Sequence, residues 1–320
     1  MKTRVAACQM EAQLGRVAEN LARADRLVQD GFARGATWVI LPEFFNSAVG
    51  FDPVMNEVAE PLEGRTLGMM RALAMGHRGF VGGSFITRRG ADCFNTFVLA
   101  RPDGSYATHD KDQPTLWEGC YYRSGDDDGV MEAGDLSVGA AVCWELLRWR
   151  TVRRLQGRID LVIGGTCWPG GPAEGPTRRL LSAFEEPARD ILREAPSRFS
   201  RLLGVPVVHA SHAGPLRCRI PLVPGPFTSH FLGETQIVDR EGLVLARRAH
   251  EEGEGVIVAD VETGAVVPKD AMPSGDGKGD PFWIPTMPPL VRAAWSVLNL
   301  HASITYGWNA DIRKRALARS

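Results

Sequence analysis

The chain has 320 residues and a mass of 34.9 kDa, with 44% hydrophobic and 23% charged residues. These fractions exclude disorder as the main state, because a disordered chain has fewer apolar residues and a larger net charge. The 37 basic and 38 acidic residues give a formal net charge of −1. Such a balance offers no electrostatic signature for nucleic acid or an anionic membrane, and we expect neither as a partner.

The N-terminal residues and the cysteines indicate a cytoplasmic protein. The apolar run after Met1 is too short for a signal peptide, and no window reaches the roughly 18 apolar residues of a membrane span. The six cysteines form no C-x-x-C pair and lie far apart, unlike those of a disulfide-stapled secreted scaffold.

Strand and helix patterns alternate along the first half of the chain. The sequence predicts a strand at 5–10, a helix at 20–35 that ends at a glycine, a strand at 38–41 and a helix at 61–75. Strands at 80–86, 95–100 and 105–109 follow, the last two joined across an Asp-Gly turn.

The second half continues the alternation. It predicts a strand at 136–142, a helix at 148–157, a strand at 160–165, separate helices at 177–194 and 196–203, and a strand at 205–210. A hairpin at 234–247, a strand at 256–261, a surface segment at 268–289 and a final helix near 290–300 complete it. Strands separated by helices favour an α/β fold, and the hairpins favour a mixed sheet.

Three reactive residue types stand at predicted strand ends. Glu43 follows a buried strand in LPEFF, where apolar neighbours would raise its pKa towards that of a useful general base. Lys111 follows a strand in HDKDQP, and Cys143 ends a strand in AVCWE before a turn whose N–H groups would favour a thiolate. Taken singly, each is more typical of a surface or core residue.

Together these segments resemble the nitrilase superfamily, also called the carbon–nitrogen hydrolase superfamily. That family carries a Glu–Lys–Cys triad in this order, each member at a strand end, and commonly a second Glu seven residues after the Lys, which is Glu118 here. The opening strand and the late segments GVPVVHASHAG and LGETQIVDREG also match, so the resemblance covers roughly residues 1–262.

The resemblance implies a four-layer α-β-β-α sandwich with two mixed β-sheets. It implies a catalytic domain over residues 1–265 and a C-terminal extension over 266–320 that packs at the interface of a homodimer or higher homo-oligomer. We expect no cofactor and no metal, because Lys111 supplies the positive charge.

The resemblance also implies a mechanism. Glu43 takes the proton of Cys143, whose sulfur attacks a carbon bonded to nitrogen and forms a covalent intermediate. Lys111 and the Trp144 backbone N–H stabilise the oxyanion, and Glu118 holds Lys111 and the substrate. We expect Phe44, Trp144 and Trp168 to contact the substrate, with the segment 166–195 either covering Cys143 or forming a surface loop.

The substrate class is less defined by the sequence. We predict hydrolysis of a small non-peptide amide, since most branches of the superfamily act on amides. Cys-Trp-Glu at 143–145 resembles the nitrile-hydrolysing branch, and an amine could also accept the acyl group, so a nitrilase and an acyl or amide transferase stay open. Arg150, where amidase branches often keep a Glu, and the residues 196–201, where they have an R-A-x-E-N helix, depart from the amidase pattern. A catalytically silent scaffold has no need for this residue set.

Overall fold

A computed structural model describes residues 1–174, 178, 185–220, 223–272 and 289–310 of the chain. Its α-helices are α1 (Val17–Ala33), α2 (Arg65–His77), α3 (Trp149–Leu155), α5 (Glu185–Leu203) and α6 (Pro289–Trp308). Its strands are β1 (Lys2–Met10), β2 (Trp38–Ile40), β3 (Glu60–Pro61), β4 (Phe80–Arg89), β5 (Asp92–Ala100), β6 (Tyr106–Asp110), β7 (Val130–Ala133), β8 (Leu136–Ala140), β9 (Leu161–Thr166), β10 (Val207–His212), β11 (Pro215–Ile220), β12 (Val223–His230), β13 (Thr235–Val238), β14 (Val244–Arg248) and β15 (Gly255–Glu262).

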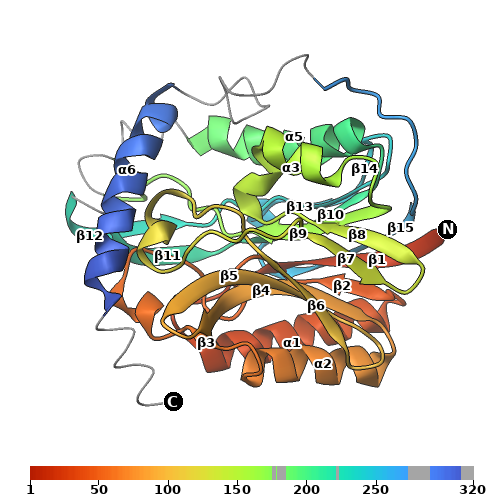
Figure 1. The fold of residues 1–320 in the computed structure, drawn as a ribbon, viewed down its shortest axis with the longest axis horizontal. Helices are drawn as coiled ribbons and strands as arrows, with labels where there is room; N and C mark the ends of the chain where they lie inside the picture. Colours follow the sequence, from red (N-terminus) through yellow and green to blue (C-terminus); the bar gives the residue numbers. More distant parts are fainter. Residues whose placement is uncertain (175–177, 179–184, 221–222, 273–288, 311–320) are drawn as a thin grey trace.

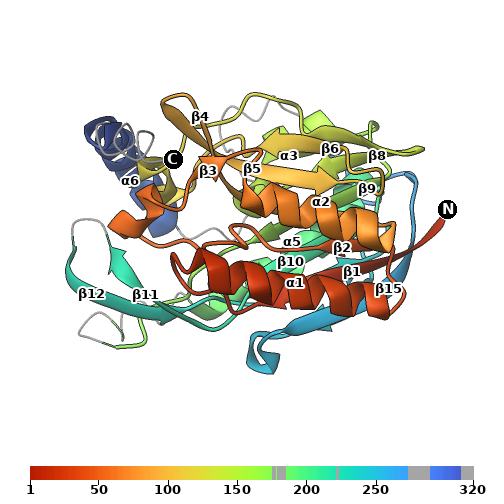
Figure 2. The same ribbon diagram turned by 90° about the horizontal axis from the view of Figure 1, so that it is seen from below.

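Most of the described strands belong to two groups. One group is paired in the order β15-β1-β2-β4-β5-β6 and the other in the order β14-β13-β10-β9-β8-β7. They join where β1 pairs in parallel with β10, with Gln9 opposite Ser211 and Met10 opposite His212. Figure 1 shows α1 and α2 outside the first group and α3 and α5 outside the second, and Figure 2 shows α1 and α2 side by side on the lower face. The predicted mixed α/β fold is confirmed, and its two strand groups are linked in one hydrogen-bonded network.

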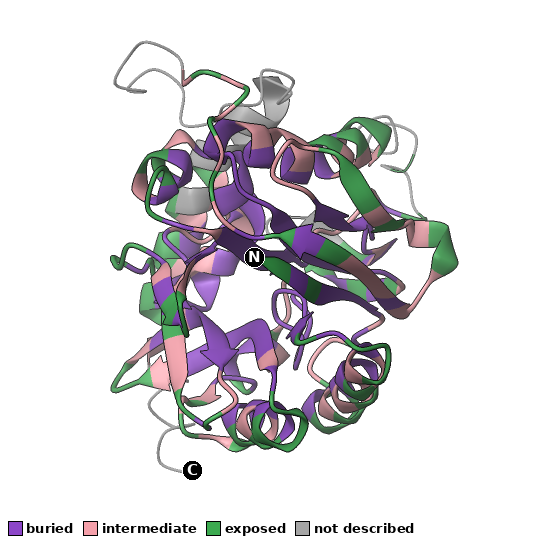
Figure 3. Cartoon of the chain, turned by 90° about the vertical axis from the view of Figure 1, so that its right-hand side faces the viewer, coloured by how far each residue is buried: buried purple, intermediate pink, exposed green. Residues whose placement is uncertain are grey.

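Alternating side chains of β1 belong to two hydrophobic cores, one on each face of the strand. Val5 and Ala7 share a core with Val162 of the second strand group, whereas Ala6 and Cys8 share one with Val28 of α1 and its neighbours. This is the two-residue period of a strand that is covered on both faces. Figure 3 shows the result, with buried strands inside and exposed residues on the outer sides of the helices.

The prediction of two helices divided at Pro196 is wrong. The structure has one helix, α5, with Pro196 inside it, and residues 177 and 179–184 of the first predicted helix lie outside the described residues. Proline removes the hydrogen bond to the carbonyl four residues earlier, which here is that of Leu192. The Gln236 side chain donates to this carbonyl at 3.2 Å, and also to the carbonyl of Arg193 at 3.2 Å. The Gln236 side chain of β13 thus replaces the hydrogen bond that the helix loses at Pro196.

The sequence patterns missed the short strands β3 and β7 and the hairpin of β11 and β12. Leu216 and Cys218 are buried in alternation along β11, but prolines interrupt the segment and conceal the strand pattern. The hairpin forms a separate two-stranded sheet. It supplies residues to the site described below.

The C-terminal helix is present, as predicted, and extends to Trp308. It packs on the turn that carries Glu118: Ala302 and Tyr306 are buried, and the Tyr306 hydroxyl donates to Asp92 at 2.9 Å. Val297, Leu300, Ile304 and Trp308 of the same helix are exposed. The boundary at residue 265 and a role of the extension at an oligomer interface stay predictions. In the part of the chain that the structure describes, the helices are all too short or too polar to cross a bilayer.

We predict that Gly164→Ala destabilises the fold close to the site. A Cβ atom on Gly164 of β9 would lie 1.9 Å from the carbonyl oxygen of Ala141, which is backbone and has little freedom to move. Overpacking of this kind costs about 1–3 kcal/mol. Urea unfolding should show this loss. The control is Gly68→Ala on α2, where no atom lies within 4 Å and alanine should stabilise the helix by about 0.5–1 kcal/mol. Equal stability of both variants would contradict the packing described here.

Candidate active site

Glu43 is held in a buried turn directly after β2. Leu41 N–H donates to the Gly82 carbonyl at 2.7 Å, which continues the β2–β4 pairing, and Phe44 then has a φ of 51°. This left-handed conformation is uncommon for a bulky residue and turns the chain sharply at this point. The Glu43 carboxylate accepts hydrogen bonds from the Asn95 side chain at 2.9 Å and from the Cys167 backbone N–H at 3.0 Å. The carboxylate is therefore fixed by strand β5 and by the residue directly after β9.

Lys111 lies between two carboxylates. It follows β6, where its backbone N–H donates to the Asn95 carbonyl at 2.9 Å. Its ammonium is 2.8 Å from Glu43 and 2.7 Å from Glu118, and the side chain is fully buried. Glu118 stands in the 3₁₀ turn Leu116–Cys120 and also accepts from the Thr115 N–H at 3.0 Å and from the Tyr122 hydroxyl. These bonds satisfy both buried carboxylates.

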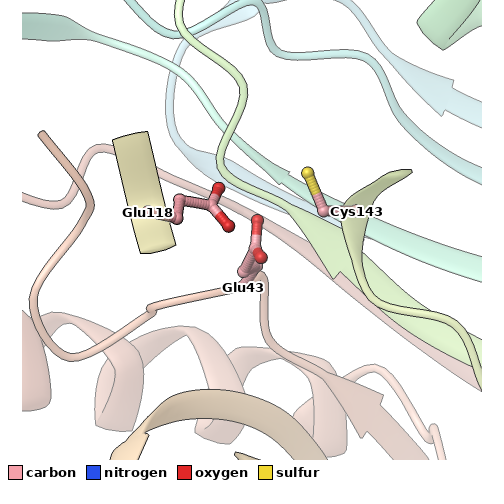
Figure 4. A group of neighbouring side chains, drawn as sticks. All are labelled: Glu43, Glu118 and Cys143. Atoms are coloured by element: carbon pink, nitrogen blue, oxygen red, sulfur yellow. The ribbon is translucent and has the colours of Figure 1, made fainter. Parts of the chain in front are cut away.

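Cys143 begins the 3₁₀ turn Cys143–Leu147 after β8, with a φ of 56°. Such a conformation in a non-glycine residue costs about 1–3 kcal/mol and concentrates at functional sites. Its Sγ atom and one carboxylate oxygen each of Glu43 and Glu118 lie within 4.8 Å of one another. Figure 4 shows these side chains converging from three separate segments. The structure thus brings together the four residues predicted as catalytic.

Burial and neighbouring charges set the pKa values of Glu43 and Lys111. Burial raises the pKa of Glu43, the Lys111 ammonium partly offsets this, the Glu118 charge adds to it, and the result is about 7. Burial alone would lower the pKa of Lys111, but the carboxylates of Glu118 and Glu43 outweigh it and hold that pKa well above the usual value. Glu43 is thus suited to exchange protons near neutral pH, as predicted, while Lys111 stays cationic.

The N–H groups of the turn were expected to favour a thiolate at Cys143, and burial of the side chain opposes that effect. Burial raises the pKa of its thiol well above the usual value, and the Glu43 carboxylate raises it further, although Lys111 opposes the shift. The turn that follows is short and does not outweigh these effects. This shift favours the neutral thiol before substrate binds, so the mechanism needs a base that takes its proton when the sulfur attacks.

Glu145 fixes the spacing between the Lys111 and Cys143 segments. This fully buried carboxylate accepts from the Val142 N–H at 2.7 Å and from the Asp112 N–H at 2.9 Å. It also contacts the His109 ring at 3.1 Å and the Arg154 guanidinium at 3.1 Å. Glu145 therefore joins the residue after Lys111 to the residue before Cys143.

A cavity of about 280 Å³ opens beside Cys143 and Glu118. Trp144 and Trp168 both line it, with ring centroids 5.2 Å apart, as do Ile191 of α5 and Phe227 of β12. Phe44 does not belong to this lining. It is fully buried and its ring packs 5.9 Å from that of Tyr122, so its position gives no support to the predicted substrate contact.

Sequence reasoning missed several residues of the site. Asn95 in the middle of strand β5 was an available signal, because asparagine is depleted in strands. The pairing of Tyr122 with Glu118, and the cavity walls formed by Ile191 and Phe227, had no local signal. They depend on how distant elements pack.

Solved structures share this fold. XC1258 from Xanthomonas campestris, described as a CN-hydrolase superfamily protein, aligns with a TM-score of 0.63 and 20% identity over 82% of this chain and 91% of that one. The amidase from Nesterenkonia sp. AN1 aligns with a TM-score of 0.65 and 17% identity over 81% of this chain and 90% of that one. This chain thus has the mixed α/β fold of these solved structures.

The sequence comparisons specify the family. The model of the carbon-nitrogen hydrolase family matches residues 4–184, more than half of the chain, and the chain belongs to that family. The nitrilase of Pyrococcus abyssi is 25% identical over 55% of this chain and 70% of its own length. The N-carbamoylputrescine amidase of Arabidopsis thaliana is 24% identical over 77% and 82%, respectively. Omega-amidase NIT2 of Danio rerio is 31% identical, but the chain spans only about half of its length. The protein is a hydrolase that acts on carbon–nitrogen bonds other than peptide bonds.

We predict that Asn95→Leu moves the acid limb of the pH profile upwards. Activity should rise with pH as Glu43 ionises, near pH 7 in the unmodified protein. Asn95 donates to the ionised carboxylate, and a hydrogen bond to a charged group contributes about 1.5–3 kcal/mol, so its loss should shift the limb by about one pH unit or more. The measurement is kcat/KM for ammonia release from a small amide between pH 5 and 9. The control is Asn56→Leu at a remote buried position, which should leave the acid limb unchanged. An acid limb in Asn95→Leu at the same pH as in the unmodified protein would contradict this account.

We predict that Glu145→Ala strongly destabilises the protein. Burial would lower the pKa of His109, but Glu145 and then Asp127 outweigh it and raise the pKa to about 9, so the ring is cationic at neutral pH. Removing Glu145 leaves this cation and Arg154 without their shared buried carboxylate, which costs about 3–5 kcal/mol. The free energy of unfolding in urea measures the loss. The control is Glu132→Ala at an exposed position of β7, and an equally small effect of both changes would show that the network carries no stability.

Proposed function

We propose that this protein hydrolyses a small non-peptide amide to the carboxylic acid and ammonia or an amine, through an acyl thioester on Cys143. One observation carries the proposal. A thiol, two carboxylates and an ammonium from separate segments meet beside one cavity, and Lys111 contacts both carboxylates directly. These are the groups that a thiol nucleophile needs for acyl transfer: a base, a cation for the oxyanion and a place for the acyl group.

Acylation begins with proton transfer from the Cys143 thiol to the Glu43 carboxylate. The sulfur bonds to the amide carbon, and the carbonyl electron pair moves to oxygen. The Lys111 ammonium and the Trp144 backbone N–H stabilise this oxyanion, a contribution of about 3 kcal/mol for each donor in comparable sites. The carbonyl then reforms, the carbon–nitrogen bond breaks, and Glu43 gives its proton to the departing nitrogen.

Deacylation uses the same groups. Glu43, again a carboxylate, takes a proton from water, and the hydroxide oxygen attacks the thioester carbon. When the second oxyanion collapses, the carbon–sulfur bond breaks and the Cys143 sulfur recovers the proton from Glu43. A base with a pKa near 7 serves both directions of transfer, because neither its acid nor its carboxylate form is strongly favoured.

Glu118 acts on Lys111 in this proposal. Its carboxylate binds the ammonium together with that of Glu43, and Tyr122 and the Thr115 N–H donate hydrogen bonds to Glu118 in turn. Because Glu118 also lines the cavity, it is placed to accept a hydrogen bond from the substrate amide or from the attacking water.

Observations on similar proteins support the proposal. In a glutamate mutant of the Nesterenkonia amidase, the acetamide moiety of fluoroacetamide is added covalently at the active-site cysteine. Two of the relatives described above are named as amidases and one as a nitrilase. Three further points stay predictions: that the enzyme needs no cofactor or metal, that it is cytoplasmic, and that it forms a homo-oligomer.

We predict that ammonia release from small amides depends on Cys143. Cys143→Ala should abolish it, and Glu43→Gln and Lys111→Met should lower kcat/KM by about a hundredfold or more, because each removes a group needed in the transition state. Ammonia assay and intact mass spectrometry of acid-quenched enzyme measure turnover and the acyl adduct. Cys218→Ala changes another buried thiol, outside the cavity lining, and should keep activity.

The same assay separates the alternatives. Ammonia release that persists in Cys143→Ala would remove the proposed mechanism. Faster release from a nitrile than from the matched amide would make the enzyme a nitrilase, and faster acyl transfer to hydroxylamine than to water would favour a transferase.

A further inference from the structure

We infer that the acyl group of the substrate is a neutral, single-ring arylalkyl group, so that the enzyme acts on amides such as 3-phenylpropanamide. The inference rests on the proposed function and specifies its substrate class. It follows from the walls, the charges and the size of the cavity beside Cys143.

The cavity walls are predominantly apolar and partly flat. Trp144 and Trp168 form a tilted pair of rings beside Cys143, and Phe227, Ile191 and Val49 also belong to the lining. Indole and phenyl faces pack well against another ring in offset or edge-to-face contact. These walls therefore favour an aromatic acyl group over a polar one.

The charged side chains in the described lining of the cavity already have ionic or hydrogen-bonding partners. Among its described residues, the charged side chains are Glu118, which binds Lys111, and Glu185. Glu185 accepts from the Arg189 guanidinium at 3.0 Å, from the His230 ring at 3.0 Å and from the Gly171 N–H at 3.2 Å. The described lining contains no lysine or arginine.

A charged acyl group would therefore be poorly accommodated. The carboxylate of a dicarboxylic acid monoamide would find no cation in the described lining, and an ammonium group would have to compete with Arg189 and His230 for Glu185. An unpaired charge taken out of water is strongly disfavoured. The part of the lining that the structure describes thus selects against anionic and cationic acyl groups.

The size of the cavity limits the acyl group to one ring with a short linker. An apolar protein cavity of roughly 150 Å³ holds a benzene molecule. The cavity here is about 280 Å³, which leaves space for a phenyl ring and the two methylene groups that separate it from the amide. A two-ring acyl group with a comparable linker would exceed it.

The test compares four amides on the purified full chain: 3-phenylpropanamide, acetamide, succinamate and 4-aminobutanamide. Burying a phenyl group contributes about 1.5–3 kcal/mol, so kcat/KM for 3-phenylpropanamide should exceed that for acetamide by roughly 10- to 150-fold. The two charged amides should fall below 3-phenylpropanamide by at least as much. Dissociation constants measured calorimetrically with Cys143→Ala should show the same order without turnover.

Two variants test the walls. Trp168→Ala should lower kcat/KM for 3-phenylpropanamide more than for acetamide. Ile220→Arg adds a cation to a half-buried position in the lining and should raise the preference for succinamate at least tenfold. The control is Ile304→Arg on the exposed side of α6, which adds the same charge away from the cavity and should leave the preference unchanged.

The outcomes distinguish this inference from the proposed function. Turnover through Cys143 in which a charged amide or acetamide equals 3-phenylpropanamide would overturn the inference and leave the amidase in place. Tighter binding of succinamate to Cys143→Ala would overturn it even if no amide is turned over. Absence of any Cys143-dependent turnover or adduct with all four amides would count against the proposed function instead.

Discussion

The buried contact of one ammonium with two carboxylates is the constraint on which the rest of this site depends. Lys111 and Glu43 have side chains that are fully buried, and Glu118 is nearly so. Charges removed from water are tolerated only when paired and hydrogen-bonded. Because the three residues follow different strands and turns, the fold must bring these segments to one point or leave a charge unpaired. Correct pairing of these charges is therefore also needed for the stability of the native state.

A second buried network sets where the thiol lies relative to this cluster. Glu145 accepts from backbone N–H groups next to Lys111 and next to Cys143, so one side chain fixes both segments through their main chains. The left-handed conformations at Phe44 and Cys143 then turn the chain as each segment leaves its strand. The geometry of the candidate site is thus held largely by backbone contacts and buried charges.

The sequence predicted those features that depend on local patterns. Hydrophobic periodicity located most strands and helices, and the strand ends in LPEFF, HDKDQP and AVCWE contain residues that the structure brings together. Features that depend on distant partners could not be predicted in this way. Within α5, Gln236 donates to the carbonyl that Pro196 leaves without a partner. Part of the cavity wall comes from α5 and β12, which are far from Glu43, Lys111 and Cys143 in sequence. Phe44 was expected at the substrate, but it packs into the core against Tyr122.

The central claim is that Cys143 is a thiol before reaction and gives its proton to Glu43. Burial and the Lys111 ammonium set the pKa of Glu43. Alkylation by iodoacetamide, followed between pH 5 and 9 by mass spectrometry of each cysteine, tests it most directly. The account predicts selective labelling of Cys143 with an apparent pKa near 7, lost in Glu43→Gln. Slow labelling of all six cysteines alike, or labelling of Cys143 that increases with pH identically in Glu43→Gln, would contradict it.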